Sequence, residues 1–192
     1  MNITPKKKSE TFNRKKKLCC IFFGIAATFD EVWHNGLIFK LIQIKLPLYL
    51  VNFFIAFLWE RKFRISLDGY NTEYHDISNG IPVTSLLLFS IYINDIPLNL
   101  KLNKSYSQLF ADDLSYFHIY KKKGEKSASK NINNHLKNLE KWFCKWRLRM
   151  APNKCNYLVF SNGSTNESEK LELKLNGIKL KYNNTPTFSQ LY

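Results

Sequence analysis

Two adjacent carboxylates, Asp112 and Asp113, stand between two short apolar runs, and this feature constrains the fold most strongly. The runs extend from Tyr106 to Phe110 and from Leu114 to Ile119. Runs of this length predict two strands joined by a tight turn that presents both acids. Adjacent carboxylates repel each other, so a fold that keeps them together commonly places a divalent cation or an arginine opposite. A solvated acidic turn is the alternative, because Asp is a common turn former.

The charge of the chain points to a polyanionic partner. Its 192 residues carry 29 Lys and Arg against 15 Asp and Glu, a formal net charge of +14. Nucleic acid is the first candidate partner and an anionic membrane surface the second. Basic residues concentrate in Lys6 to Lys17 and again in Lys121 to Lys123, with Lys126 and Lys130 following. Solvated tails and loops are the alternative explanation for each of these runs.

The cysteines and the longest apolar segment limit the cellular setting. Four cysteines without Cys-x-x-Cys spacing or paired histidines argue against zinc and for a reducing, intracellular compartment, with nucleus and cytoplasm not distinguished. The segment from Leu46 to Trp59 contains Pro47 and Asn52. It is shorter than the roughly 18 residues expected of a spanning helix. We therefore predict a buried helix there and no membrane partner.

Hydrophobic periodicity predicts an α+β fold with one sheet backed by helices on one face. The expected elements are a strand over 18–23, helices over 37–44 and 50–58, a hairpin over 63–77 turning at Asp68-Gly69, a helix over 85–96, the strand pair around the acids, a helix over 132–146, a strand over 157–160 and a hairpin over 171–180 turning at Asn176-Gly177. We divide the chain into a basic arm over 1–17, a main body over 18–160, and a loop with terminal hairpin over 161–192.

Several stretches, in this order and spacing, resemble successive motifs of one enzyme family. They are Phe29 to Leu37, Asn79 to Pro82, Leu87 to Pro97 and Phe110 to Asp113, followed by Trp146 to Cys155. The first four resemble motifs of the reverse transcriptase, an RNA-directed DNA polymerase, of non-LTR retrotransposons. The last is similar to the corresponding stretch of jockey-like transposable elements. The likeness covers about residues 10–190.

The resemblance implies the palm of a right-hand polymerase, with an antiparallel sheet, helices behind it, and an RNA template and DNA primer across its front. Chemistry in that family is nucleotidyl transfer assisted by two Mg²⁺ ions. Carboxylates on two neighbouring strands hold these ions. In this chain Asp112 and Asp113 match the catalytic, metal-binding acids of the second strand.

Four further residues match positions that face the nucleotide in the family. Phe29 matches the residue beneath the nucleotide sugar, with ordinary core packing as an equal alternative. Gly80 and Pro82 belong to a nucleotide-facing turn. Lys154 resembles a lysine near the active site, and a solvated loop lysine is its alternative.

The hairpin predicted over 63–77 carries a basic edge formed by Arg61, Lys62 and Arg64. A positive edge of this kind can contact the phosphate backbone of nucleic acid. These three side chains are the nucleic-acid-binding residues that we predict.

Departures from the family pattern predict that the chain is catalytically inactive. Gly24 stands where the family has the metal-binding Asp of the first strand, and Asp30, six residues on, is expected to begin a helix instead. The Gln-Gly-Ser step that normally follows Pro82 is deleted, which weighs against deoxynucleoside triphosphate binding. Fingers, thumb and endonuclease regions are also expected to be absent. We therefore expect a degenerate relic, and the alternative is a non-catalytic, basic nucleic-acid-binding module.

Overall fold

The computed structural model describes residues 16–25, 29–82, 85–96, 105–110, 113–161 and 171–183. The chain divides into two compact units. One unit comprises Met1–Ala26, Ile96–Cys144 and Met150–Tyr192, and the other comprises Ala27–Asp95 and Lys145–Arg149. Every strand of the largest sheet lies in the first unit.

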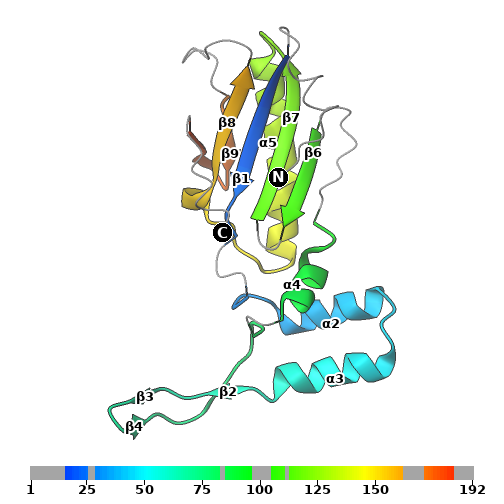
Figure 1. Ribbon diagram of the computed structural model, residues 1–192, viewed down its shortest axis with the longest axis vertical. Coiled ribbons are helices and arrows are strands. Elements are labelled where there is room, and N and C mark those ends of the chain that lie inside the picture. The colour runs from blue at the N-terminus through cyan, green and yellow to red at the C-terminus, as the bar shows by residue number, and fades with distance from the viewer. Residues whose placement is uncertain are drawn as a thin grey trace. The chain divides into compact units, whose positions relative to one another are not determined.

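A five-stranded sheet lies in the first unit, in the order β11-β8-β1-β7-β6, and Figure 1 labels β8, β1, β7 and β6. Its strands are β1 (Lys16–Phe23), β6 (Ser105–Phe110), β7 (Asp113–Lys121), β8 (Asn156–Ser161) and β11 (Lys181–Tyr182). The pairs β1–β7, β1–β8 and β6–β7 are antiparallel, and β11 is parallel to β8. The predicted α+β class is confirmed, and the short β11, which the sequence analysis missed, makes the sheet mixed.

Helix α5 (Glu125–Lys145) lies behind this sheet (Figure 1). Ile132, Leu136, Leu139 and Phe143 recur at three- and four-residue spacing and are buried, which gives the helix one apolar face. The helix begins earlier than predicted. Near its first residue, the buried Lys17 Nζ donates a hydrogen bond to Glu125 Oε1 at 3.0 Å. The strand therefore includes Lys16 and Lys17, which the sequence analysis assigned to the basic arm.

The two faces of the sheet are both apolar at its centre. Because side chains alternate along a strand, Cys19 and Ile21 share the α5 face with Lys17, and Leu18 and Cys20 lie on the opposite face. On that opposite face, a buried cluster packs against further half-buried apolar side chains. The cluster consists of Leu18, Cys20, Phe117 and Leu158, and its half-buried neighbours are Phe22, Tyr106 and Ile119. The sequence predicts that β1 is covered on both of its faces, and this prediction is confirmed.

Two hairpins turn where the sequence predicts them. In the second unit, β2 (Lys62–Phe63) pairs with β5 (His75–Asp76), and β3 (Ser66–Leu67) pairs with β4 (Tyr70–Asn71). In the first unit, β9 (Lys174–Leu175) pairs with β10 (Ile178–Lys179). Both central residues of each turn, Asp68-Gly69 and Asn176-Gly177, have positive φ. Asx-Gly pairs suit such turns because both residue types tolerate the left-handed region.

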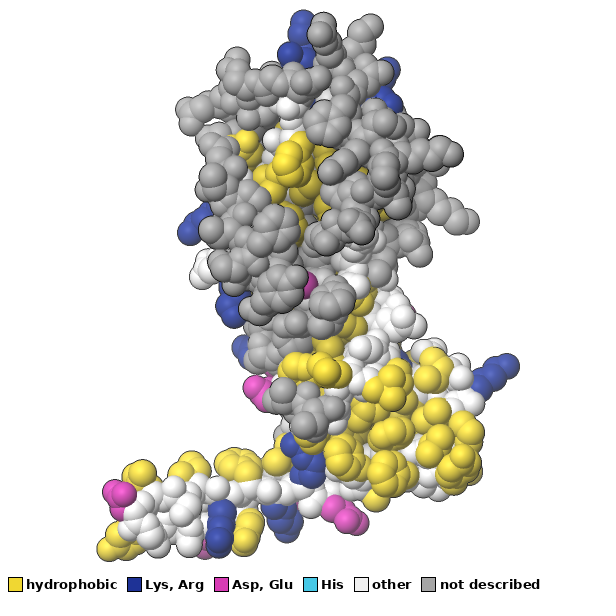
Figure 2. All heavy atoms as spheres, in the orientation of Figure 1, with side chains coloured by type: hydrophobic (Ala, Val, Ile, Leu, Met, Phe, Trp, Pro, Cys, Tyr) yellow, Lys and Arg dark blue, Asp and Glu magenta, His cyan; other side chains and the backbone are white. Residues whose placement is uncertain are grey.

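Three helices form the rest of the second unit: α2 (His34–Gln43), α3 (Leu48–Trp59) and α4 (Leu86–Ile93). The sequence correctly predicts a helix at α3, but the prediction that this helix is buried is wrong. Only Val51 and Leu58 of α3 are buried, and its outer face contributes to the exposed apolar surface in Figure 2. Among the described residues, no helix combines the length and apolar character needed to cross a membrane.

Candidate active site

The candidate site lies at the end of the sheet where β1 finishes and β7 begins. The antiparallel register ends with Phe23 opposite Leu114. Gly24 follows Phe23 and Asp113 precedes Leu114 in the chain, so both residues lie at this end of the strand pair. The motif alignment predicts that Gly24 faces the acidic turn across neighbouring strands, and the described part of that turn is Asp113. Asp113 is half-buried and pairs with Phe110 of β6 on its other side.

The acidic turn itself is only partly described. The pairing of Phe110 with Asp113 leaves a two-residue connection, Ala111-Asp112, between β6 and β7. The predicted hairpin is therefore present. Asp112, the main predicted metal ligand, lies outside the described residues.

The space beside Gly24 is occupied by Lys154. A Cβ built onto Gly24 would lie 2.6 Å from Lys154 Cβ and 3.3 Å from Lys154 Cδ. Two backbone hydrogen bonds fix this approach: Ala151 N–H donates to the Gly24 carbonyl at 2.9 Å, and Lys154 N–H donates to the Ala151 carbonyl at 2.9 Å. Lys154 belongs to the 3₁₀ turn Pro152–Lys154 and is exposed. The predicted proximity of Lys154 to the site is thus a close packing of its stem against Gly24.

The described residues do not fit a site for two divalent ions. Such ions need several carboxylate oxygens from both strands. Gly24 supplies no side chain, and the neighbouring Lys154 is a cation. Within the described parts of the chain, no group of three or more His, Cys, Asp or Glu residues is placed to hold a metal ion.

The other predicted nucleotide-facing residues lie in the second unit. The Phe29 ring packs against Phe89, with ring centroids 5.2 Å apart. The Phe29 carbonyl accepts a hydrogen bond from Ile81 N–H at 2.8 Å. Pro82, the residue after Ile81, is half-buried. Asp30 lies in a turn and does not cap a helix, because α2 begins at His34 after Trp33.

Gly80 holds a backbone junction at this position. Its φ of +85° is in the region that favours glycine, and an added Cβ would lie 2.9 Å from the Asp30 carbonyl oxygen. The Gly80 N–H donates to the Val32 carbonyl at 2.8 Å. The Gly80 carbonyl lies 2.7 Å from His34 Nε2 and accepts a hydrogen bond from Arg61 Nη1 at 2.9 Å. These contacts give Gly80 a structural reason to be glycine.

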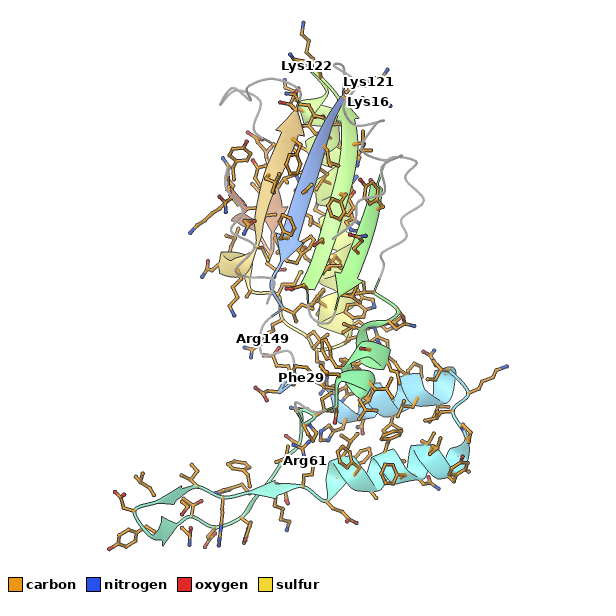
Figure 3. The ribbon with its side chains drawn as sticks, in the orientation of Figure 1. Lys16, Phe29, Arg61, Lys121, Lys122 and Arg149 are labelled. Atoms are coloured by element: carbon orange, nitrogen blue, oxygen red, sulfur yellow. The ribbon has the colours of Figure 1, made fainter. Side chains whose placement is uncertain are left out.

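The three cations predicted to contact nucleic acid all have partners within the chain. Arg61 donates to Gly80, as described above, and is labelled in Figure 3. Lys62 Nζ lies 3.6 Å from Asp76 Oδ1 across the hairpin. The Arg64 guanidinium lies over the Tyr74 ring at 5.2 Å. The hairpin therefore uses part of its positive charge to stabilise itself.

Sequence reasoning missed a buried cation in the second unit. Lys40 Nζ lies 3.7 Å from the centroid of the Trp146 ring and donates a hydrogen bond to Asp95 Oδ1 at 2.5 Å. Burial lowers the pKa of Lys40 to about 8, although Asp95 acts in the opposite direction. Lysines at helical spacing are usually solvated, so no local signal in the sequence identifies this one.

A second feature joins the two basic runs of the sequence in a lysine cluster at the other end of β1 and β7. Lys16 and Lys121 are direct cross-strand partners, and Lys122 follows (Figure 3). Like charges opposite each other destabilise a sheet unless a counter-charge is present. The eight residues of β1 separate this cluster from Gly24 by roughly 25 Å at about 3.3 Å per residue. We call Lys16, Lys121 and Lys122 the lysine end of the sheet.

Comparison with known proteins identifies the family. The family described as "Reverse transcriptase (RNA-dependent DNA polymerase)" matches residues 2–180. The chain belongs to the reverse transcriptase family. Members of this family copy RNA templates and use divalent metal ions.

Curated relatives agree with the jockey-like resemblance. The reverse transcriptase of mobile element jockey from Drosophila melanogaster is 30% identical over 162 residues, covering 80% of this chain and 17% of that protein. A probable RNA-directed DNA polymerase from transposon X-element of the same species is 27% identical over 155 residues, covering 78% and 17%. The chain thus spans about a sixth of the length of the curated relatives it matches.

Solved structures share the fold. Apo telomerase from Candida tropicalis, truncated from its C-terminal domain, matches with a TM-score of 0.59 at 14% identity, over 83% of this chain and 33% of that one. Telomerase from the same species in complex with a TWJ fragment of telomeric RNA matches with a TM-score of 0.57 at 13% identity, over 83% and 28%. The predicted palm fold of this reverse transcriptase domain is confirmed.

Proposed function

We propose that this chain is the palm of a retrotransposon reverse transcriptase that no longer catalyses nucleotidyl transfer. The observation that carries the proposal is that the pairing of β1 with β7 ends at Phe23 and Leu114, directly beside Gly24 and Asp113. In the family this end of the strand pair holds Mg²⁺ between carboxylates of two strands. Here one strand offers no oxygen ligand, and the stem of Lys154 fills the space in which that ligand would stand.

The substrates of the ancestral reaction are an RNA template, a DNA primer and deoxynucleoside triphosphates. Loss of the shared ligand removes the means of bringing two ions to the primer end, and Asp30 does not replace it. We therefore assign no catalytic step to Asp112 or Asp113. They mark the ancestry of the site.

Primer extension tests this proposal. The chain is incubated with an RNA template, an annealed DNA primer, deoxynucleoside triphosphates and either Mg²⁺ or Mn²⁺. We expect no extended product. Product that disappears on Asp112→Ala would overturn the proposal, because that result requires a working metal site.

A second candidate function, non-catalytic binding of nucleic acid, is favoured by the lysine end of the sheet. Lys16 and Lys121 face each other on paired strands, and a phosphate between them would relieve their repulsion. The net charge of +14 adds a long-range attraction. The central face of the sheet opposite α5 is apolar, so we assign this binding to the end of the sheet and not to that face.

A salt titration of single-stranded RNA binding tests the second candidate. Binding should weaken steeply with salt, and Lys16→Gln, Lys121→Gln and Lys122→Gln together should lower the log–log slope by about 2, since each lost phosphate contact contributes roughly 0.7. The matched control removes the same charge from the exposed lysines of the C-terminal strands, Lys174, Lys179 and Lys181. Equal slopes for the two triple variants would contradict the assignment.

A further inference from the structure

Helix α3 is apolar apart from Asn52, but only one of its sides is buried. Its twelve residues include no charged side chain. Val51 and Leu58 form the buried stripe, while Tyr49, Phe53 and Phe57 are exposed on the opposite side. A helix that is hydrophobic all round is normally covered on all sides. The outer face of α3 therefore has the composition of an interface.

A hollow lies between this face and the start of α4. Phe53, Phe54 and Phe57 line it from α3, and Ser85, Leu87 and Leu88 line it from α4 and the residue before it. Its volume is about 190 Å³. An apolar cavity of roughly 150 Å³ can hold a benzene ring. The hollow can therefore accept one aromatic side chain from outside the unit.

The same face also carries a protruding aromatic side chain. Tyr49 lies about one helical turn before Phe53, so the two side chains share a face, and Tyr49 is 71% exposed. Phe57 lies one turn after Phe53 and stacks on it, with ring centroids 6.3 Å apart. Tyr49 thus projects on one side of Phe53, and the hollow, which Phe53 helps to line, extends toward Phe57 on the other side. A projection beside a hollow can be self-complementary under a twofold rotation.

We propose that this face is the interface of a homodimer in which α3 packs antiparallel against α3 of a second copy. The twofold axis passes beside Phe53. Tyr49 of each copy enters the hollow beside Phe57 and Leu87 of the other. The interface is closed, so association stops at two chains.

The exposed apolar area suits a stable dimer. The exposed fractions of Tyr49, Phe53, Phe57 and Leu87 are 71%, 60%, 38% and 70%. At roughly 200 Å² for a fully exposed aromatic side chain and somewhat less for leucine, they present about 450 Å². A standard interface buries about 800 Å² on each partner, of which roughly 60% is apolar. The four side chains therefore supply most of the apolar part of such an interface.

Electrostatics gives the proposed dimer a distinctive salt dependence. Two chains of +14 repel each other, but α3 itself brings no like charges into contact. The repulsion acts over longer distances and is screened beyond about 10 Å at 0.1 M salt. Dimerisation should therefore strengthen as salt is added, whereas binding of nucleic acid weakens. The two salt dependences have opposite signs, so they distinguish self-association from a pair of chains bridged by nucleic acid.

Sedimentation equilibrium and cysteine cross-linking test the proposal. Nuclease-treated protein should fit a monomer–dimer equilibrium whose association constant rises with salt. In a Cys144→Ser background, which removes the exposed native cysteine, Phe53→Cys should form a disulfide-linked dimer on oxidation. The control is Ile65→Cys, because Ile65 is similarly exposed, at 61%, but lies on the hairpin. Far-UV circular dichroism verifies that each variant is folded.

The pairing of Tyr49 with Phe57 gives a second arm to the test. A mixture of Tyr49→Cys and Phe57→Cys chains should cross-link faster than either variant alone, since the twofold axis at Phe53 brings these two positions together. A chain that stays monomeric, or that grows into larger species, overturns the proposal. Cross-linking of Phe53→Cys no faster than Ile65→Cys also overturns it.

Discussion

The packing of Lys154 against Gly24 predicts a strong energetic coupling between the two positions. A methyl group at residue 24 would lie 2.6 Å from Lys154 Cβ. Carbon atoms pack optimally at about 3.5–4.0 Å, so roughly 1 Å of movement is needed. Lys154 Cβ is attached directly to the backbone of a turn that is hydrogen-bonded to Gly24 through Ala151, and it has no rotamer that moves it away.

The magnitude follows from two opposing effects. Overpacking of this kind costs about 1–3 kcal/mol. Replacement of glycine by alanine stabilises by about 0.4–1 kcal/mol through the unfolded chain. We therefore expect Gly24→Ala to lower the free energy of unfolding by about 1–2 kcal/mol in the parent chain. In a Lys154→Gly background the collision is gone, and the same substitution should raise it by up to about 1 kcal/mol.

A double-mutant cycle measures the coupling. Urea unfolding of the four chains, followed by tryptophan fluorescence, should give a coupling energy of about 1–3 kcal/mol between residues 24 and 154. The cost of Lys154→Gly itself cancels in the cycle. A Gly24→Ala effect that is the same in both backgrounds would refute the packing argument. The same collision applies to Gly24→Asp, so we expect this single reversion not to restore primer extension.

Three further predictions concern buried groups and Gly80. Burial lowers the pKa of Lys40 from 10.5 to about 8, so the unfolded state binds more protons than the folded state between these pH values. The free energy of unfolding should therefore rise with pH from about 8 upward. Urea unfolding checks this, because the rise should be smaller in Lys40→Met than in the parent chain. Burial, with a smaller effect of His118, lowers the pKa of His135 from 6.5 to about 4. Stability should therefore rise between pH 4 and 6.5 by up to about 3 kcal/mol in the parent but much less in His135→Phe, and an equal rise in both would contradict the buried, neutral imidazole. Gly80→Ala should destabilise the chain by about 1–3 kcal/mol more than Gly69→Ala. The two glycines share a φ near +86°, but only Gly80 has a backbone oxygen within 3 Å of the added Cβ. Equal melting temperatures of the two variants would contradict this.

Local patterns predicted the parts of the fold that local chemistry determines. The apolar run of β1, the acidic hairpin and the turn at Asn176-Gly177 follow from strand runs and turn residues. The placement of Gly24 beside the acidic turn rests on the motif alignment, and the described register ends one pair before it, at Phe23 and Leu114.

Other features depend on contacts between distant segments, and the sequence could not provide them. The outer face of α3 has the same composition as a buried helix, so its exposure is visible only when the neighbouring elements are in place. The approach of Lys154 to Gly24 joins residues 130 positions apart. Strand β11 has only two residues, which is too short for a periodic pattern of side chains. It is a strand because it pairs with β8.

Mn²⁺ binding is the sharpest test of the proposed loss of catalysis, because that loss rests on a missing metal site. Electron paramagnetic resonance counts Mn²⁺ ions bound to the parent chain and to Asp113→Asn. We expect weak binding that is the same in both chains, as for scattered surface carboxylates. Two ions bound with micromolar affinity by the parent, and lost in Asp113→Asn, would contradict it.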